Sequence, residues 1–322
     1  MGGHREEGGH RSSRGVRRKT ARKTHIKYEG IQPTTERRYR KAITRFFGHL
    51  TLLCMGLPNS LEELDEAVGE FINHLYLDDY PQYWATDLIS ALKRFYPKCR
   101  RHLEIASLYH KNWLRVTVRT RALPASLDIV LGMAAVALIE SSTRLAFIIL
   151  LGFIGLLRAG ELITLTGRQL ALYGGGSLLV VSLPESKSAK RSGSGEQVTV
   201  VDPLVLKLAA VVLKSTRPEE CVYPGTWRTF AADIRRLGLA FGITSPRFTP
   251  YCLRRGGATW HFTKYCSYDA TQHLGRWDQA KTARVYIDQA TAEASELRLP
   301  DWAQQRLGTA KRCLQALVRQ AS

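Results

Sequence analysis

Four side-chain types that can act together on a phosphate ester occur at separate points in the second half of the chain. A guanidinium fork can hold two phosphate oxygens without losing its proton, and an indole N–H can only donate a hydrogen bond. A lysine can protonate a departing oxygen, and a tyrosine hydroxyl can attack to form a covalent intermediate. The residues that could supply these functions are Arg158, Lys187, Arg254, Trp277 and Tyr286.

The order and spacing of these residues are more specific than any one of them. Arg158 lies in Gly-Leu-Leu-Arg-Ala-Gly-Glu-Leu, and Arg254 lies in Tyr-Cys-Leu-Arg-Arg-Gly-Gly at the start of a predicted helix. Trp277 follows Arg254 by 23 residues and precedes Tyr286 by nine. This ordered set resembles the catalytic domain of tyrosine recombinases, the phage-integrase superfamily. The Arg-Arg-Gly-Gly-Ala-Thr and Gly-Arg-Trp forms are most similar to recombinases of eukaryotic mobile elements, including retrotransposons.

The resemblance implies a site-specific DNA recombinase or integrase that cleaves and rejoins DNA through a 3′-phosphotyrosine at Tyr286. Arg158 and Arg254 would hold the non-bridging phosphate oxygens, Trp277 would donate to the same phosphate, and Lys187 would protonate the leaving 5′-oxygen. The phosphotyrosyl bond retains the energy for resealing, so we expect no cofactor. We also expect no metal, because the sequence has no paired carboxylates or His/Cys cluster at metal-ligand spacing.

Tyr251 departs from the family pattern, which most often has histidine three residues before the second arginine. A phenol can donate a hydrogen bond to phosphate but is a poor base near neutral pH, because phenols ionise at about pH 10. His261 and His273 are the nearest histidines in sequence; each is a substitute for the missing histidine or an ordinary surface or core histidine. Glu161, one turn after Arg158, is expected to orient an arginine without touching the phosphate.

Two other roles, the general acid and the nucleophile, have alternative candidate residues. Lys190 shares the predicted hairpin tip with Lys187, and we favour Lys187 because it is nearer the first strand. Tyr265 and Tyr268 are alternative nucleophiles, but neither has the spacing from tryptophan that Tyr286 has.

The first part of the chain predicts a basic arm followed by a small helical domain. Residues 1–27 contain nine Lys or Arg and almost no apolar side chains, which predicts disorder. Thr34 or Thr35 is expected to cap a first helix, and Ser60-Leu-Glu-Glu has capping-box spacing before a second. Two more periodic segments cover 82–95 and 103–116. We therefore predict a four-helix domain over 28–117, which the resemblance implies is a SAM-like core-binding domain, and a linker at 118–125.

Residues 126–322 are predicted to form a mostly α domain with a small β-hairpin or sheet, so the whole chain is expected to be mainly α. The resemblance implies that this domain is catalytic and has an integrase-like DNA breaking-rejoining fold. Segments 127–139 and 142–157 are apolar nearly all round and are expected to be central helices, with Arg158 at the end of the second. The β-branched runs 177–183 and 197–201 predict the hairpin. The remaining helices are expected at 203–215, 226–241, 250–263, 279–290 and 302–318, the last docking on a neighbouring protomer or on its own domain.

The charge of the chain favours a polyanionic partner. Its 47 Lys and Arg exceed its 28 Asp and Glu by 19, and the excess is shared by residues 1–120 (22 basic, 13 acidic) and 121–322 (25 basic, 15 acidic). We expect double-stranded DNA as the partner, with the protein assembled on it as a homodimer or homotetramer. The six cysteines form no CxxC pair, and no apolar run is long enough for a membrane span.

Two rival functions are compatible with the same residues. A domesticated DNA-binding protein would retain the fold with little or no activity, which Tyr251 would explain. A type IB topoisomerase-like relaxer would share the tyrosine nucleophile but act as a monomer. The polar, basic N-terminus and reduced cysteines predict a nuclear protein if the source is eukaryotic and a cytoplasmic one otherwise.

Overall fold

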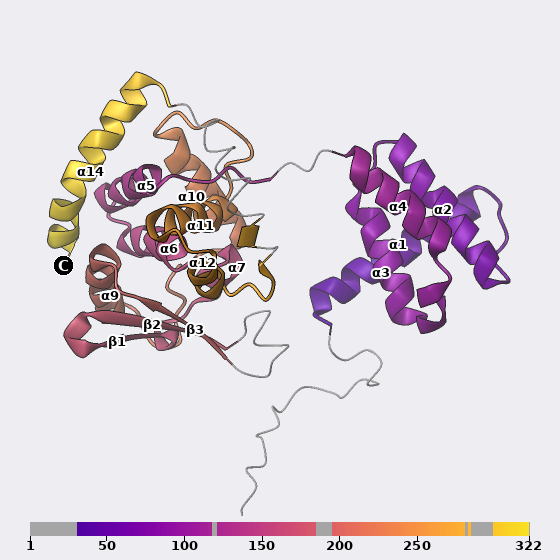
Figure 1. Cartoon of the computed structure of the whole chain (residues 1–322), viewed down its shortest axis with the longest axis horizontal. Helices are drawn as coiled ribbons and strands as arrows, with labels where there is room; N and C mark the ends of the chain where they lie inside the picture. Colours follow the sequence, from indigo (N-terminus) through magenta and orange to yellow (C-terminus); the bar gives the residue numbers. More distant parts are fainter. Residues whose placement is uncertain (1–30, 118–120, 185–194, 281–282, 285–298, 322) are drawn as a thin grey trace, which may run out of the picture. The chain divides into compact units, whose positions relative to one another are not determined.

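The chain divides into two units, Met1–Arg119 and Thr120–Ser322 (Figure 1). The computed structural model describes residues 31–117, 121–184, 195–280, 283–284 and 299–321. The predicted arm 1–27 and the predicted site residues Lys187, Lys190 and Tyr286 lie outside these ranges.

The described part of the first unit is a helical bundle. Its α-helices are α1 (Pro33–Leu52), α2 (Leu61–Leu77), α3 (Tyr83–Phe95) and α4 (Glu104–Val116), with a 3₁₀ helix η2 (Pro97–Arg101) between the last two. The start of α1 differs from the prediction: Gln32 is the N-cap and Pro33 the first helical residue, so neither Thr34 nor Thr35 caps the helix. Proline suits that position because its fixed φ is already helical and its missing N–H would have no partner there.

Polar side chains connect the helices of this bundle. The buried carboxylate of Asp65 on α2 accepts hydrogen bonds from the backbone N–H groups of Ile105 (2.8 Å) and Ala106 (2.9 Å), which open α4. These N–H groups have no partner within their own helix, so the carboxylate stabilises the start of α4. Ser60 caps α2, as predicted, by accepting from the N–H of Glu63.

The second unit is built around α6. Its α-helices are α5 (Leu127–Ile139), α6 (Thr143–Ile154), α7 (Ala159–Thr164), α9 (Pro203–Ser215), α10 (Trp227–Leu239), α11 (Tyr251–Tyr265), α12 (Tyr268–Gly275) and α14 (Asp301–Ala321). Nine residues of α6, on all sides of the helix, are buried, because α5, α9 and α11 pack against it (Figure 1). An all-round apolar helix is stable in water only when it is enclosed in this way.

A three-stranded antiparallel sheet packs against this helical core. Its strands are β1 (Leu170–Tyr173), β2 (Leu178–Leu183) and β3 (Glu196–Val200), in the order β1-β2-β3, and two short 3₁₀ helices, η3 (Gly167–Gln169) and η4 (Gly174–Gly176), flank β1. Val181 on β2 lies opposite both Leu170 and Val198. The predicted hairpin corresponds to β2 and β3, whereas β1, with only four residues, was not predicted.

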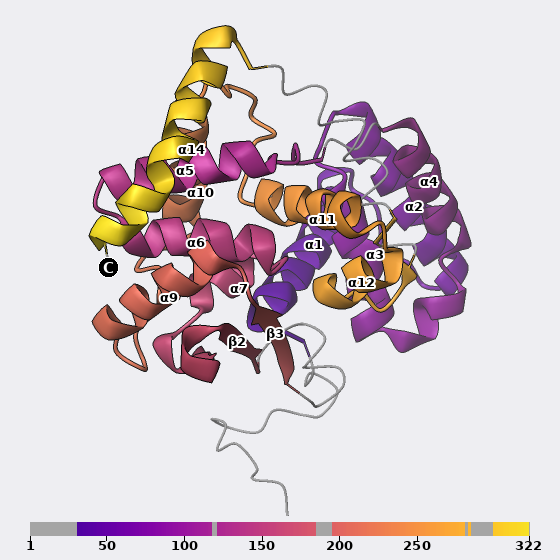
Figure 2. The ribbon, with the colours of Figure 1, turned by 60° about the vertical axis from the view of Figure 1, so that its left-hand side comes forward.

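The C-terminal helix α14 packs along α5 of its own unit (Figure 2). Its side chains Leu307, Leu314 and Val318 are buried in the core of the second unit. A Cβ atom at Gly132 of α5 would overlap the side chain of Leu307, so glycine at that position permits the close approach. Of the two predicted alternatives, the structure shows docking on the helix's own domain.

Within the described ranges, no helix has both the length and the hydropathy needed to cross a lipid bilayer. All six cysteines have free thiols, and only Cys99 and Cys252 are buried.

Candidate active site

Arg158 begins a helix rather than ending one. The sequence predicted that the central helix would run to residue 157, but α6 stops at Ile154, and Leu156 adopts a left-handed conformation (φ 48°). This turn makes Arg158 the N-cap of α7. Glu161, at the third position of α7, accepts a hydrogen bond from the Arg158 backbone N–H (2.7 Å) and another from its Nη1 (2.7 Å). Glu161 therefore fixes both the backbone and the guanidinium of Arg158.

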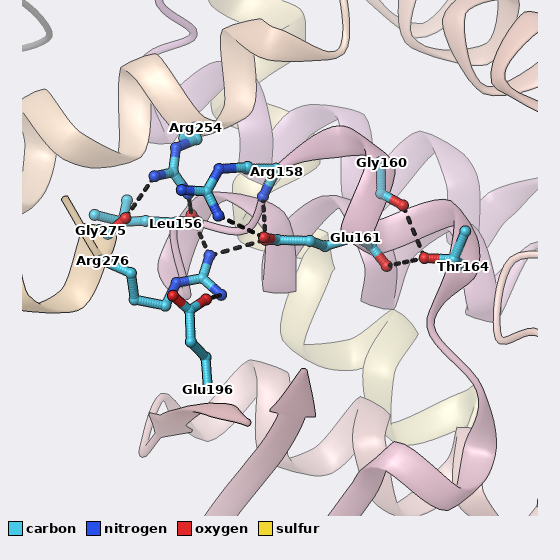
Figure 3. A network of polar contacts seen from close by, with 9 residues as sticks. All are labelled: Leu156, Arg158, Gly160, Glu161, Thr164, Glu196, Arg254, Gly275 and Arg276. Carbon is cyan, nitrogen blue, oxygen red and sulfur yellow. Dashed lines mark hydrogen bonds and ion pairs between the residues drawn. The ribbon is translucent and has the colours of Figure 1, made fainter. Parts of the chain in front are cut away.

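Arg254 lies in the first turn of α11, as predicted, but its guanidinium is buried. Its side chain donates from Nη1 to the carbonyl oxygen of Leu156 and from Nη2 to that of Gly275, while its Nε has no hydrogen-bond partner among the described residues (Figure 3). Arg254 thus connects the turn after α6 to the end of α12. A direct contact between Arg254 and a phosphate would use Nε or the second N–H group of Nη1 or Nη2.

Two glycines allow α11 to bring Arg254 this deep. A Cβ atom at Gly256 would overlap the carbonyl group of Ala125, and one at Gly257 would overlap the carbonyl oxygen of Phe153 on α6. Any other residue at either position would push α11 away from its neighbours. The Arg-Arg-Gly-Gly sequence therefore supplies both the cation and the space that it needs.

Trp277 packs against the side chain of Arg254. Its ring centroid lies 4.8 Å from the Arg254 guanidinium carbon, and 8 % of the residue is exposed. The ring also fills the space where a side chain at Gly275 would stand. Cation–π contact with a desolvated guanidinium is favourable, so Trp277 supports the position of Arg254 in addition to its predicted role as a hydrogen-bond donor.

Arg276 joins this site, although the sequence did not single it out. Its Nη2 donates to Glu161 Oε2 (2.8 Å), and its Nη1 forms a 3.6 Å ion pair with Oε2 of Glu196 at the start of β3 (Figure 3). We call the five residues in this network, Arg158, Glu161, Glu196, Arg254 and Arg276, the arginine cluster. The only sequence signal for Arg276 was its place between Gly275 and Trp277.

Burial and the nearby charges of the cluster shift the pKa values of Glu161 and Arg254. Burial alone would raise the pKa of the Glu161 carboxyl, but the charge of Arg276 and the hydrogen bonds from Arg158 outweigh it and hold that pKa below its ordinary value. Burial, reinforced by the nearby charges of Arg158 and Arg276, lowers the pKa of Arg254 to about 9. The carboxylate is therefore ionised and the guanidinium protonated at neutral pH.

One guanidinium of the cluster, that of Arg158, is partly exposed. About 29 % of the Arg158 side chain is exposed, against 8 % for Arg276, and Arg254 is almost completely buried. Arg158 is therefore the member best placed to touch a phosphate from solvent.

Tyr251 and the two nearby histidines lie in different surroundings. Tyr251 is the first residue of α11, one turn before Arg254, and it is partly buried. His261 forms a 2.8 Å hydrogen bond through Nδ1 with Thr271 Oγ1, and burial lowers the pKa of its imidazole, as expected of a histidine with a packing role. His273 lines a groove of about 610 Å³ that Arg276 also lines.

No group of three or more His, Cys, Asp or Glu side chains within the described ranges could hold a metal ion. Glu161 and Glu196 both face Arg276.

Comparisons with known proteins agree with this geometry only at the level of fold. No protein-family model matches the chain, and no curated protein matches its sequence. Among solved structures, it is similar to the Tn1549 transposon integrase in complex with a circular intermediate DNA, with a TM-score of 0.59, 16 % identity, and coverage of 84 % of this chain and 96 % of that one. The same integrase with transposon right end DNA gives a TM-score of 0.57, 14 % identity, and coverage of 84 % and 95 %.

A third similar structure is the XerH site-specific recombinase bound to palindromic difH substrate in a post-cleavage complex. Its TM-score is 0.50 at 15 % identity, with coverage of 80 % of this chain and 76 % of that one. This chain has the tyrosine recombinase fold. The predicted fold class, mainly α with a small antiparallel sheet, is thereby confirmed.

Proposed function

We propose that this protein is a site-specific DNA recombinase or integrase that cleaves and rejoins DNA through a covalent 3′-phosphotyrosine intermediate at Tyr286. The observation that carries the proposal is that Arg158 and Arg254 of the arginine cluster, far apart in sequence, occupy one site, with Trp277 packed against Arg254. Three guanidinium groups face two carboxylates there, so the cluster has one positive charge in excess. A phosphodiester carries one negative charge and would balance it.

The position of Ala283 supports Tyr286 as the nucleophile. Ala283 is buried in a small apolar cluster with Leu156, Ala258 and Trp277, which places the chain beside Arg254 three residues before Tyr286. Three residues span at most about 10 Å of extended chain. This short connection supports the proposal that the Tyr286 hydroxyl attacks a phosphate held at the cluster.

The proposed reaction exchanges one phosphoester for another. The Tyr286 oxygen bonds to phosphorus as its proton passes to solvent, and the bond to the 5′-oxygen breaks as Lys187 supplies a proton to that oxygen and regains one from solvent. Arg158 contacts the non-bridging oxygens from the solvent side, while Arg254 and Trp277 stabilise the developing charge from beneath. Resealing is the reverse reaction with a 5′-hydroxyl, and it needs no metal or high-energy cofactor.

The wider setting of the reaction is part of the same proposal. Two of the similar structures are complexes of a transposon integrase with DNA, which supports double-stranded DNA as the partner and a mobile element as the context. Strand exchange between two duplexes requires more than one active site, so we propose a homodimer or homotetramer on DNA. Lys and Arg contacts to phosphates would make DNA binding fall steeply with salt concentration.

A library of nicked duplexes with a randomised core tests this function without knowledge of the target site. The nick lets the short strand beyond the cleaved phosphate diffuse away, so the covalent protein–DNA adduct accumulates and survives denaturation. We expect wild-type protein to capture a defined sequence, with or without EDTA, and Tyr286→Phe to capture none because the phenol oxygen is missing. Tyr265→Phe and Tyr268→Phe are matched controls that should still form the adduct.

Other results would change the assignment. An adduct that persists in Tyr286→Phe would move the nucleophile elsewhere, and one that needs magnesium would reject the metal-free reaction. Sequence-specific DNA binding by wild-type protein that forms no adduct would favour a domesticated, inactive DNA-binding protein. Tyr251, at the position where the family most often has histidine, favours that second function.

A further inference from the structure

The turn at the end of α12 sends Arg276 into the interior. Arg276 has a left-handed backbone conformation (φ 54°), which is uncommon for a residue with a side chain. Gly275 before it has no room for a Cβ atom, because the Trp277 ring fills that space. The turn is therefore constrained on both sides, and 92 % of the Arg276 side chain is removed from solvent.

The Arg276 guanidinium lies between two carboxylates from different elements. Its Nη2 is 2.8 Å from Oε2 of Glu161 on α7, and its Nη1 is 3.6 Å from Oε2 of Glu196 on β3. Only 10 % of the Glu161 side chain and 17 % of the Glu196 side chain are exposed. At such burial the attraction between opposite charges is much stronger than in water.

The charge balance of the cluster depends on Arg276. With Arg276 present, three cations face two anions, and the excess matches one phosphodiester. Without it, Glu161 and Glu196 would balance Arg158 and Arg254, so these four side chains would have no net charge. Asp269 and Asp278 line the adjoining groove but are exposed, where water and salt screen their charges.

Arg158 would be affected first by the loss of Arg276. Glu161 accepts from both arginines, one on each side of its carboxylate. If Arg276 were absent, the full charge of a buried carboxylate would act on Arg158, the most exposed guanidinium of the cluster. The attraction would hold Arg158 against Glu161 and weaken its contact with a phosphate.

We propose that Arg276 is a positioning residue that neutralises Glu161 and so leaves the charge of Arg158 available to the scissile phosphate. The proposal rests on the function proposed above, because it concerns the same phosphate. Arg276 is assigned this role and not a phosphate contact because its Nη2 donates to Glu161 and its Nη1 faces Glu196.

Rescue by a second substitution is the decisive test. We expect Arg276→Gln to slow adduct formation on the captured nicked duplex about 100-fold, the typical effect of losing one electrostatic contribution at a reacting centre. Glu161→Gln in the same chain removes the uncompensated carboxylate and should restore about tenfold of that loss. Arg276→Lys keeps the positive charge and should lie between Arg276→Gln and wild type.

A matched control is available in the same unit. Arg236 on α10 also pairs with two carboxylates, those of Glu140 and Asp233, but it is half-exposed and outside the arginine cluster. Arg236→Gln should leave the rate of adduct formation within about twofold of wild type. An equal loss in Arg236→Gln and Arg276→Gln would show that the effect of Arg276 is not specific to the site.

A deeper defect in the double variant would contradict the proposed role of Arg276. If Arg276 were only a link between the end of α12 and the start of β3, adding Glu161→Gln would deepen the defect of Arg276→Gln, and this outcome would overturn the proposal. A thermal unfolding curve for each variant of the full chain separates loss of folding from loss of phosphate contact.

An inorganic phosphate titration keeps this test independent of catalysis. Phosphate binding can be followed through the NMR signal of the Arg158 Nε–H group in each variant. We expect weaker binding in Arg276→Gln and recovery in the double variant, even if wild-type protein forms no adduct and the proposed function fails. Equal phosphate affinity in all three proteins would refute the proposed role of Arg276 and leave the proposed function unaffected.

Discussion

Two arginines of the second unit each lie between two carboxylates, yet their surroundings give them different properties. Arg236 pairs with Glu140 (2.5 Å) and Asp233 (3.2 Å), and 47 % of its side chain is exposed. Arg276 pairs with Glu161 and Glu196 and is 8 % exposed. The Arg236 group has one cation for two anions, whereas the Arg276 group includes two further arginines and is positive.

The difference extends to the ionisation of the arginines. Hydrogen bonding to Glu140 raises the pKa of Arg236, while burial lowers the pKa of Arg254 in the cluster to about 9. The Arg236 charge is already compensated at the surface and adds little to stability. The cluster keeps cations out of water with less than full compensation, an arrangement that a bound anion would complete. Burial and charge balance, more than residue type, therefore distinguish the arginine cluster from a surface ion pair.

The largest effect is expected from Arg254→Lys. An ammonium cannot reproduce the fork that donates to both Leu156 and Gly275, so adduct formation should fall about 100- to 1000-fold. Loss of one charge-assisted hydrogen bond should also lower the free energy of unfolding by about 2 kcal/mol. Adduct kinetics and urea unfolding measure the two effects.

Arg255 provides the control for this substitution. Its side chain is as deeply buried as that of Arg254 and donates to the carbonyl oxygen of Ala122, outside the cluster. Arg255→Lys should lower the free energy of unfolding by a similar amount. Its rate of adduct formation per folded molecule should stay at the wild-type value. If the two variants lost adduct formation equally, buried charge in general, and not the cluster, would be the cause.

A fall in pH is expected to have an intermediate effect on the free energy of unfolding. The pKa of Glu161 is lower in the folded chain than in the unfolded chain, so its ionised form stabilises the fold above its unfolded pKa of about 4.3. This stabilisation is lost as the pH falls through the folded value, at about 1.4 kcal/mol for each unit between the two pKa values. Urea unfolding over this acidic range should show a smaller decline for Glu161→Gln than for wild type, and parallel curves would contradict the coupling.

The smallest effect is expected from Arg236→Gln. Exposed ion pairs contribute about 0.5 kcal/mol, so the free energy of unfolding should change by about that amount and the change should shrink at high salt. Denaturant unfolding at two salt concentrations measures both. A loss as large as that of Arg254→Lys would remove the contrast between the exposed and buried sites.

Local sequence signals predicted most helices closely. The segments 127–139 and 203–215 have the same bounds as α5 and α9, because Ser126 and Asp202 cap their first turns with side-chain hydrogen bonds and their apolar faces are unbroken. The short elements β1, α7 and α12 were missed. These three segments have four to eight residues and, unlike the β-branched runs of β2 and β3, no pattern clear enough to be recognised at that length; neighbouring elements hold them in place.

The candidate site likewise contains residues that the sequence revealed and one that only the structure revealed. Arg158, Arg254 and Trp277 were recognisable from order and spacing, and the structure brings them together. The part played by Arg276 was not recognisable, because its carboxylate partners are 115 and 80 residues away in sequence. The roles assigned to Lys187 and Tyr286 stay predictions, since both residues lie outside the described ranges.

The sequence alone therefore determined most of the helices, the chemical types available to the site and the ordered spacing that resembles tyrosine recombinases, because these can be recognised from short segments and their order along the chain. Only the tertiary structure decided which guanidinium is exposed, which ones bind backbone carbonyls, and that Arg276 balances Glu161. Burial and the sum of nearby charges are properties of the packed chain, and they arise only when distant segments meet.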